Sequence, residues 1–93
     1  MGSRVAYCRR VEEKLRDWDD LFDELRDEAA GQTTRVRSRY ARCAESFRPR
    51  HEEAQQRLAS MLEAPDGQWR QLKPDLDASV DELRKVVERA KIV

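Results

Sequence analysis

The stretch CRRVEEKLRDWDDLFDELRDEA, residues 8–29, carries apolar side chains at alternating steps of three and four residues. Nearly all residues between these positions are polar or charged. This spacing places the apolar side chains along one narrow stripe of an α-helix, as in the a and d positions of a coiled coil. Such a helix has to pack against another helix to remove its stripe from water. The stripe consists of Cys8, Val11, Leu15, Trp18, Phe22, Leu25 and Ala29.

The composition of the chain favours long helices over strands. Charged residues make up 41% of the 93 residues and hydrophobic residues 39%, with only three Gly and three Pro. This mixture is typical of coiled coils, and the sustained apolar period argues against disorder. The length suits one domain with a modest core. The sequence therefore predicts one all-α coiled-coil domain over residues 1–93.

Three helical segments are expected, at about 4–30, 34–63 and 68–91. The second segment ends where Ala64-Pro65-Asp66-Gly67 combines several helix breakers. Pro49 removes a helical hydrogen bond, but the apolar positions resume after it, so we expect a bend at this residue. The regular part of the last segment starts either near residue 68 or as late as Asp75 or Ser79, since Ser79 and Glu82 match a capping box.

The segment from Gly31 to Thr34 admits two interpretations. Gly and Thr lower helix propensity, which favours a turn. The apolar spacing nevertheless continues without a change of phase through Gln32, Val36, Tyr40, Cys43 and Phe47. Because a turn has no reason to preserve this phase, the sequence favours one long bent helix, with a shorter C-terminal helix folded back on it. The alternative is a compact three-helix bundle.

Acidic and basic residues are separated along a chain with no net charge. Residues 17–28 hold seven acids against Arg26, and residues 35–50 hold six arginines against Glu45. A chain that turns at residues 31–34 brings these blocks together, and so does an antiparallel pair of unbroken helices from two chains. A hairpin of only two segments, the long helix and the shorter helix folded back on its second half, leaves the stripe Val11–Leu25 uncovered, so we expect a homodimer formed through helix–helix contacts.

The residues expected to mediate helix packing and self-association are apolar residues at helical spacing. The last segment returns antiparallel along the second segment, which brings its apolar residues against the second half of the long helix. The expected packing residues are Val11, Leu15, Trp18, Phe22, Leu25, Val36, Tyr40, Phe47, Leu58, Trp69, Leu72, Val80 and Leu83.

The chain resembles a family of small bacterial coiled-coil proteins commonly labelled stress-response proteins, first named from cyanobacteria. The spacing between the shared positions is free of gaps over nearly the whole chain. Two departures are Val80, where the family tends to have a second Trp in the last helix, and the weak helix formers at residues 31–34 and 49. The shared residues are Tyr7, the stretch LRDWDDLFDEL at 15–25, Tyr40, EEAQQRL at 52–58, WRQLK at 69–73, Asp77-Ala78 and Asp81-Glu82-Leu83.

This resemblance implies an all-helical, cytoplasmic coiled-coil protein associated with stress, and it brings no catalytic residues. The sequence leads to the same expectation, because no group of residues in it is typical of a catalytic, cofactor or metal site. His51 stands alone and is expected to pack at a helix edge. Cys8 and Cys43 lie on the apolar stripe, where we expect reduced, buried thiols; a redox sensor is the other reading. We therefore expect a protein that is not an enzyme.

A basic stripe on the second segment is the strongest candidate for a different function. Arg35, Arg39 and Arg42 share one helical face and are able to follow a phosphate backbone. The matching acidic block favours pairing within the protein, so nucleic acid is not expected as the partner. No apolar run approaches the about 20 residues of a membrane span. We thus predict a structural or interaction protein acting on itself or on a protein partner, with binding of nucleic acid or an anionic surface through Arg35–Arg50 as the alternative.

Overall fold

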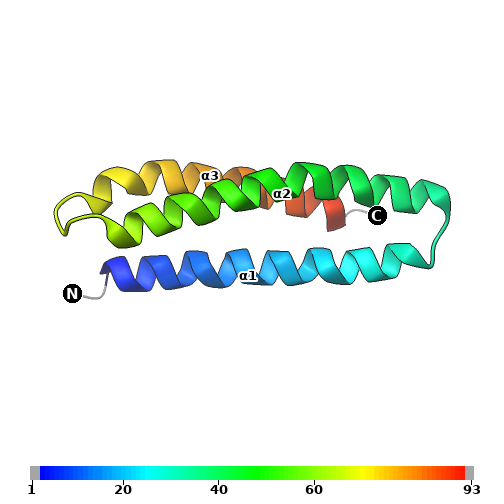
Figure 1. The fold of residues 1–93 in the computed structure, drawn as a ribbon, viewed down its shortest axis with the longest axis horizontal. Helices are drawn as coiled ribbons and strands as arrows, with labels where there is room; N and C mark the ends of the chain where they lie inside the picture. The colour runs from blue at the N-terminus through cyan, green and yellow to red at the C-terminus, as the bar shows by residue number, and fades with distance from the viewer. Residues whose placement is uncertain (1–2, 92–93) are drawn as a thin grey trace.

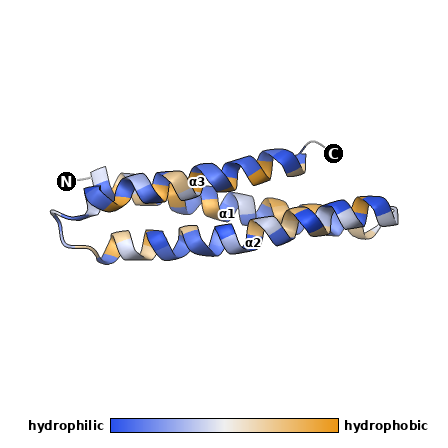
Figure 2. Cartoon of the chain, turned by 90° about the horizontal axis from the view of Figure 1, so that it is seen from above, coloured by the Kyte–Doolittle hydropathy of each residue, from blue (hydrophilic) through white to orange (hydrophobic). Residues whose placement is uncertain are grey.

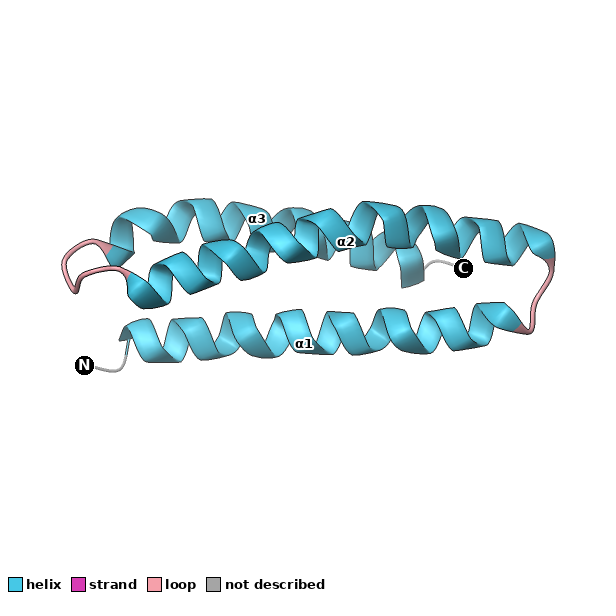
Figure 3. Ribbon diagram, in the orientation of Figure 1, coloured by secondary structure: helices cyan, strands magenta, loops and turns pink. Residues whose placement is uncertain are grey.

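The computed structural model describes residues 3–91 and consists of three helices (Figure 1). They are α1 (Ser3–Ala30), α2 (Thr34–Glu63) and α3 (Trp69–Lys91), joined by loops at 31–33 and 64–68 (Figure 3). These bounds lie within one residue of the expected ranges. The predicted all-α fold is confirmed. Residues 1–2 and 92–93, which the expected domain also includes, lie outside the described residues.

The expected unbroken helix through residues 31–34 is wrong for the single chain. The chain turns back after Ala30, so α2 runs antiparallel to α1 (Figure 1). The backbone N–H of Gln32 donates to the carbonyl of Ala29 at 3.0 Å. Thr33 is extended and caps α2, since its hydroxyl accepts from the backbone N–H of Val36 at 3.4 Å. The turn covers the stripe of α1 within one chain, without the entropic cost of association.

The compact three-helix bundle, which was the alternative, is therefore the observed arrangement. Helix α2 packs closely on both α1 and α3, whereas α1 and α3 meet at fewer positions. The bundle measures 52 × 18 × 18 Å along its principal axes. The apolar phase persists across residues 31–34 because both helices have to face the same core.

The core contains the apolar faces of all three helices (Figure 2). The largest fully buried side chains are those of Met61, Leu76, Leu83 and Val87. Among the residues expected to pack, Val36 is half-buried and lies outside the core. The others divide into a buried set, Val11, Leu15, Phe22, Phe47, Leu58 and Leu83, and a set partly buried against the core, Trp18, Leu25, Tyr40, Trp69, Leu72 and Val80.

Two prolines lie inside helices without ending them. Helix α2 continues through Pro49, as expected, and α3 continues through Pro74. Close to Pro49, the guanidinium of Arg50 donates to the carbonyl and the hydroxyl of Ser46, at 2.9 and 3.1 Å. The late start considered for the last helix is wrong, since α3 begins at Trp69.

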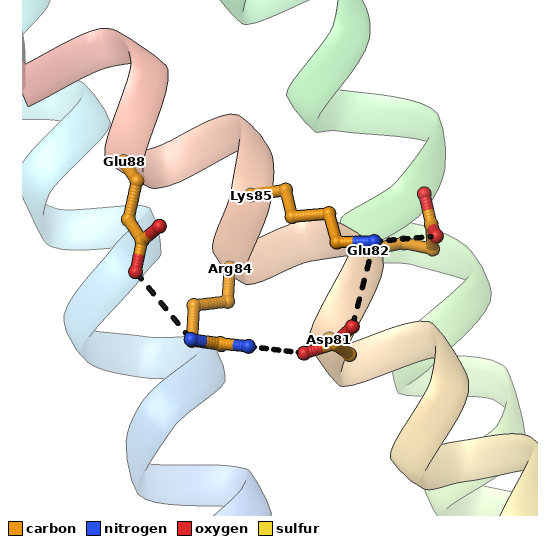
Figure 4. A network of polar contacts seen from close by, with 5 residues as sticks. All are labelled: Asp81, Glu82, Arg84, Lys85 and Glu88. Carbon is orange, nitrogen blue, oxygen red and sulfur yellow. Dashed lines mark hydrogen bonds and ion pairs between the residues drawn. The ribbon is translucent and has the colours of Figure 1, made fainter.

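The exposed face of α3 carries a network of ion pairs (Figure 4). Arg84 pairs with Asp81 and, at 3.5 Å, with Glu88; Lys85 pairs with Asp81 and Glu82, both at 3.6 Å. In every pair the two residues are three or four positions apart, so they are neighbours on one helix surface. Exposed pairs of this kind contribute little to stability, because water screens them. The network supports the helix and brings no groups together from different elements.

Candidate interaction surface

Helix α3 stops short of the end of the bundle where α1 turns into α2 (Figure 1). It has 23 residues against 30 in α2. At 1.5 Å per residue, the seven missing residues correspond to about 10 Å of helix. Residues 25–43, which we call the hairpin tip, are therefore only partly covered by α3.

A hollow of about 260 Å³ lies on the hairpin tip, just beyond the last turn of α3. We call it the tip groove. Ala90, in the last turn of α3, is one of its lining residues, and the lining residues Leu25, Val36 and Tyr40 are half-buried. The groove thus continues the path along which α3 packs. Its apolar lining consists of Leu25, Ala29, Val36, Tyr40, Cys43 and Ala90.

The two sides of the tip groove carry opposite charge. Glu28 of α1 lines one side and Arg39 of α2 lines the other. They belong to the acidic block at 17–28 and the basic block at 35–50, which the structure places on the two neighbouring helices of the hairpin, as the charge pattern predicted for a turn. Arg26 forms local pairs with Asp23 and Asp27, at 3.5 and 3.6 Å.

Aromatic rings of α1 and α2 pack against each other next to Tyr40, which lines the tip groove. The Phe22 ring stacks on Phe47, with centroids 4.0 Å apart and an interplanar angle of 18°. The ring centroid of Tyr40 lies 6.3 Å from that of Phe22. The Tyr40 hydroxyl donates a hydrogen bond to the backbone carbonyl of Phe22 at 3.2 Å. These contacts join α1 to α2 beside the groove.

His51 adds to these aromatic contacts and packs in the α1–α2 interface. Its ring stacks on Phe47 with centroids 5.1 Å apart. Its Nε2 lies 2.9 Å from the carbonyl oxygen of Leu15. A carbonyl oxygen only accepts, so Nε2 has to carry a proton in this contact. The structure thus places His51 in a packing role at the helix edge.

The two cysteines are free thiols in different surroundings. Cys8 is buried and Cys43 is partly buried at the tip groove. Burial raises the pKa of the Cys8 thiol, which disfavours the reactive thiolate. Cys8 lies on α1 and Cys43 on α2, and the two form no disulfide.

Acidic side chains also gather on the outer face of α1. Carboxylate oxygens of Asp19, Asp20 and Asp23 lie within 4.8 Å of one another. All three residues are exposed and belong to one helix. This grouping follows from the sequence of a strongly acidic helix segment and is not enclosed by other elements.

Two contacts at the other end of the bundle escape sequence reasoning. Arg4 donates to the carbonyl of Ala64 at 2.6 Å and pairs with Asp66 at 3.0 Å, so α1 caps the C-terminal end of α2. The Tyr7 hydroxyl donates to Asp77 of α3. Lys73 Nζ lies 5.1 Å from the centroid of the Tyr7 ring. Only the folded register brings these residues together, so no local signal marks them.

Burial and then the hydrogen bond to Asp77 raise the pKa of the Tyr7 hydroxyl. On α3, the hydrogen bond from Arg84 lowers the pKa of the exposed Asp81 carboxyl. These shifts arise from contacts that hold the helices or support the surface of one helix.

Comparison with protein-family models, curated proteins and solved structures finds no match to this chain. Within residues 3–91, no helix combines the length and the apolar character needed to cross a membrane.

Proposed function

We propose that this chain is a non-enzymatic interaction protein that acts through self-association and helix–helix contacts. The observation that carries the proposal is the tip groove, an apolar hollow with one acidic and one basic side. Helix-in-groove recognition uses apolar anchors at helical spacing, and charged rims fix the orientation of the partner. Because the groove continues the path of α3, it fits the apolar face of a further helix.

The resemblance to the bacterial stress-response family adds a cellular setting to this proposal. It supports a bacterial, cytoplasmic protein whose helix contacts matter under stress. The support comes from the residues quoted above, such as Trp18 and Trp69, both partly buried against the core. It assigns no reaction and no cofactor.

Light scattering over a series of protein and salt concentrations tests the self-association. We expect the mass to rise from 11.0 kDa, the mass of one chain, toward twice that value as concentration increases. Val36→Glu places a charge in the tip groove and spares the core, because Val36 is half-buried and outside it. We expect this variant to weaken association by about tenfold or more, since a charge facing an apolar contact loses at least about 1.4 kcal/mol.

Val5→Glu is the matched control. Val5 is 58% exposed, near the opposite end of the bundle, so the same substitution there should leave association unchanged. A wild-type mass of 11.0 kDa at every concentration, or equal effects of the two variants, would overturn the proposal.

Polyanion binding is the second candidate, and one observation favours it. Arg35, Arg39 and Arg42 are all exposed on the N-terminal half of α2. Fluorescence anisotropy with labelled single-stranded RNA and duplex DNA at moderate salt tests this surface. The first variant changes these three arginines to Glu; the control variant changes the exposed Arg9, Arg16 and Arg89 to Glu.

We expect both triple variants to weaken any binding to nucleic acid equally. The chain has no net charge, so its arginines should contact phosphates without preference for one surface of the protein. A larger loss of binding in the variant of Arg35, Arg39 and Arg42 would instead establish the second candidate. In that case the slope of the logarithm of the binding constant against the logarithm of the salt concentration should correspond to about three fewer phosphate contacts.

A further inference from the structure

We propose that a pocket between α1 and α3 binds a small ligand that carries two or more adjacent phosphate groups. The pocket has a volume of about 310 Å³ and lies beside the first half of α1. We call it the α1–α3 pocket. It is separate from the tip groove, whose first lining residue, Leu25, lies about 16 Å further along α1 than Lys14. This inference therefore does not rest on the function proposed above.

The α1–α3 pocket forms where two parallel helices are incompletely packed. Helices α1 and α3 begin at the same end of the bundle and run in the same direction (Figure 1). They meet at fewer positions than the other helix pairs, which leaves space between them. The hydrogen bond from Tyr7 to Asp77 joins residues 70 positions apart, which gives the register of the two helices. Lys14 and Arg84 have the same separation, so the two walls carry these cations at about the same level.

The lining of the α1–α3 pocket has an excess of positive charge. Its two carboxylates are already engaged: Asp77 accepts a hydrogen bond from Tyr7, and Asp81 pairs with Arg84 and Lys85 (Figure 4). Two basic residues come from α1 and two from α3, so the positive charge does not arise from one helix alone. The basic lining residues are Arg10, Lys14, Lys73 and Arg84.

Three of these cations have no acidic partner in the described part of the chain. Within residues 3–91, Arg10, Lys14 and Lys73 form no ion pair. The ammonium group of Lys73 lies over the Tyr7 ring instead, 5.1 Å from its centroid. Like charges that two helices bring to one pocket repel each other, and an anion bound between them would offset this repulsion.

The arrangement of these cations fits a compact anion with several charges. Arg10 and Lys14 are one helical turn apart, about 6 Å along α1, and Lys73 reaches Tyr7 from the opposite wall. Adjacent phosphate groups share a bridging oxygen and so concentrate their charges, whereas sugars separate the phosphates of nucleic acid. The planar guanidinium of Arg10 can bind two phosphate oxygens at once, and each lysine adds a point charge. The pocket therefore fits a diphosphate or triphosphate group.

Isothermal titration calorimetry with sodium pyrophosphate, at moderate salt and without divalent cations, tests the pocket. One variant combines Arg10→Gln with Lys14→Gln. The matched control combines Arg9→Gln with Arg16→Gln, which removes the same charge from exposed positions of α1 outside the pocket. We expect the first variant to bind pyrophosphate about tenfold or more weakly than the wild type, and the control to change affinity by no more than about twofold. All four residues are exposed, so both variants should fold, as circular dichroism can verify.

Two further titrations test the position and the chemistry of the ligand. Lys73→Gln should also weaken binding, because a ligand held between the helices contacts both walls; an unchanged affinity would overturn binding between α1 and α3. Citrate carries a similar negative charge at neutral pH but no phosphate, and it should bind about tenfold more weakly than pyrophosphate. Equal binding of the two anions would overturn the assignment to phosphate. Absence of saturable pyrophosphate binding, or equal losses in the two double variants, would overturn the site itself.

Discussion

Changing Phe47 to Ala is expected to lower the free energy of unfolding by about 3–5 kcal/mol, a large fraction of the stability of a domain this size. Phe47 is 3% exposed, and its ring stacks between Phe22 and His51 at the centre of the α1–α2 interface. Its removal leaves a cavity between two long helices that cannot close around it without losing the other stacked contacts. Denaturant unfolding followed by circular dichroism measures the loss.

Leu62→Ala is the control for this prediction. Leu62 is 56% exposed on the same helix, so its truncation should change the free energy of unfolding by no more than about 0.5 kcal/mol. Phe47→Leu should fall between the two, because it keeps apolar volume but loses the stacking. A loss below about 1 kcal/mol for Phe47→Ala would contradict the placement of Phe47 in the core.

The periodicity was sufficient to predict the three helices and most of their packing faces. Residues such as Leu15, Phe22 and Leu83 are buried because their spacing places them on the apolar face of a helix, which packs against the other helices. The same periodicity misled at residues 31–34. Phase continuity is required both by an unbroken helix and by two antiparallel helices that share a core, so it does not distinguish a turn from a continuation.

The N-cap at Thr33 was the better local signal for the turn. Its hydroxyl stabilises the start of α2, and Gly31 weakens the preceding turn. A single chain gains the antiparallel contacts at no translational cost, which favours the turn in the monomer.

The tip groove was only partly predictable. The expected segments already differed in length, so the sequence contained the reason why α3 does not cover the hairpin tip. Its lining could not be derived, because it depends on where Ala90 meets α1 and α2. The contacts of Arg4 with Ala64 and of Tyr7 with Asp77 join residues far apart in the sequence and follow only from the three-dimensional register.

The charge blocks show what a sequence can say about electrostatics. Their opposition predicted the antiparallel order of α1 and α2. It did not predict individual pairs: Arg26 pairs within its own helix, with Asp23 and Asp27. Long exposed side chains can exchange one ion-pair partner for another with little change in free energy. Blocks of charge therefore determine the relative orientation of two helices, while the individual ion pairs form between neighbours on one helix.

Changing Tyr7 to Phe is expected to produce stability curves that cross the wild-type curve at alkaline pH. Below pH 9 the variant should be less stable by about 1 kcal/mol, because it loses the hydrogen bond to Asp77, whose exposed carboxylate remains hydrated. Burial and that hydrogen bond raise the pKa of the Tyr7 hydroxyl above its ordinary value of about 10.

Above pH 10 the unfolded wild-type chain ionises Tyr7 while the folded chain keeps the proton. The folded state then binds more protons than the unfolded state, so the free energy of unfolding falls with pH, by at most about 1.4 kcal/mol per unit from this group. The Phe variant lacks this loss and should become the more stable protein. Cys8, whose pKa burial also raises, lowers stability above pH 9 in both proteins and cancels in the comparison. Denaturant unfolding at pH 8–11.5 measures both curves; parallel curves would show that Tyr7 is not held protonated between α1 and α3.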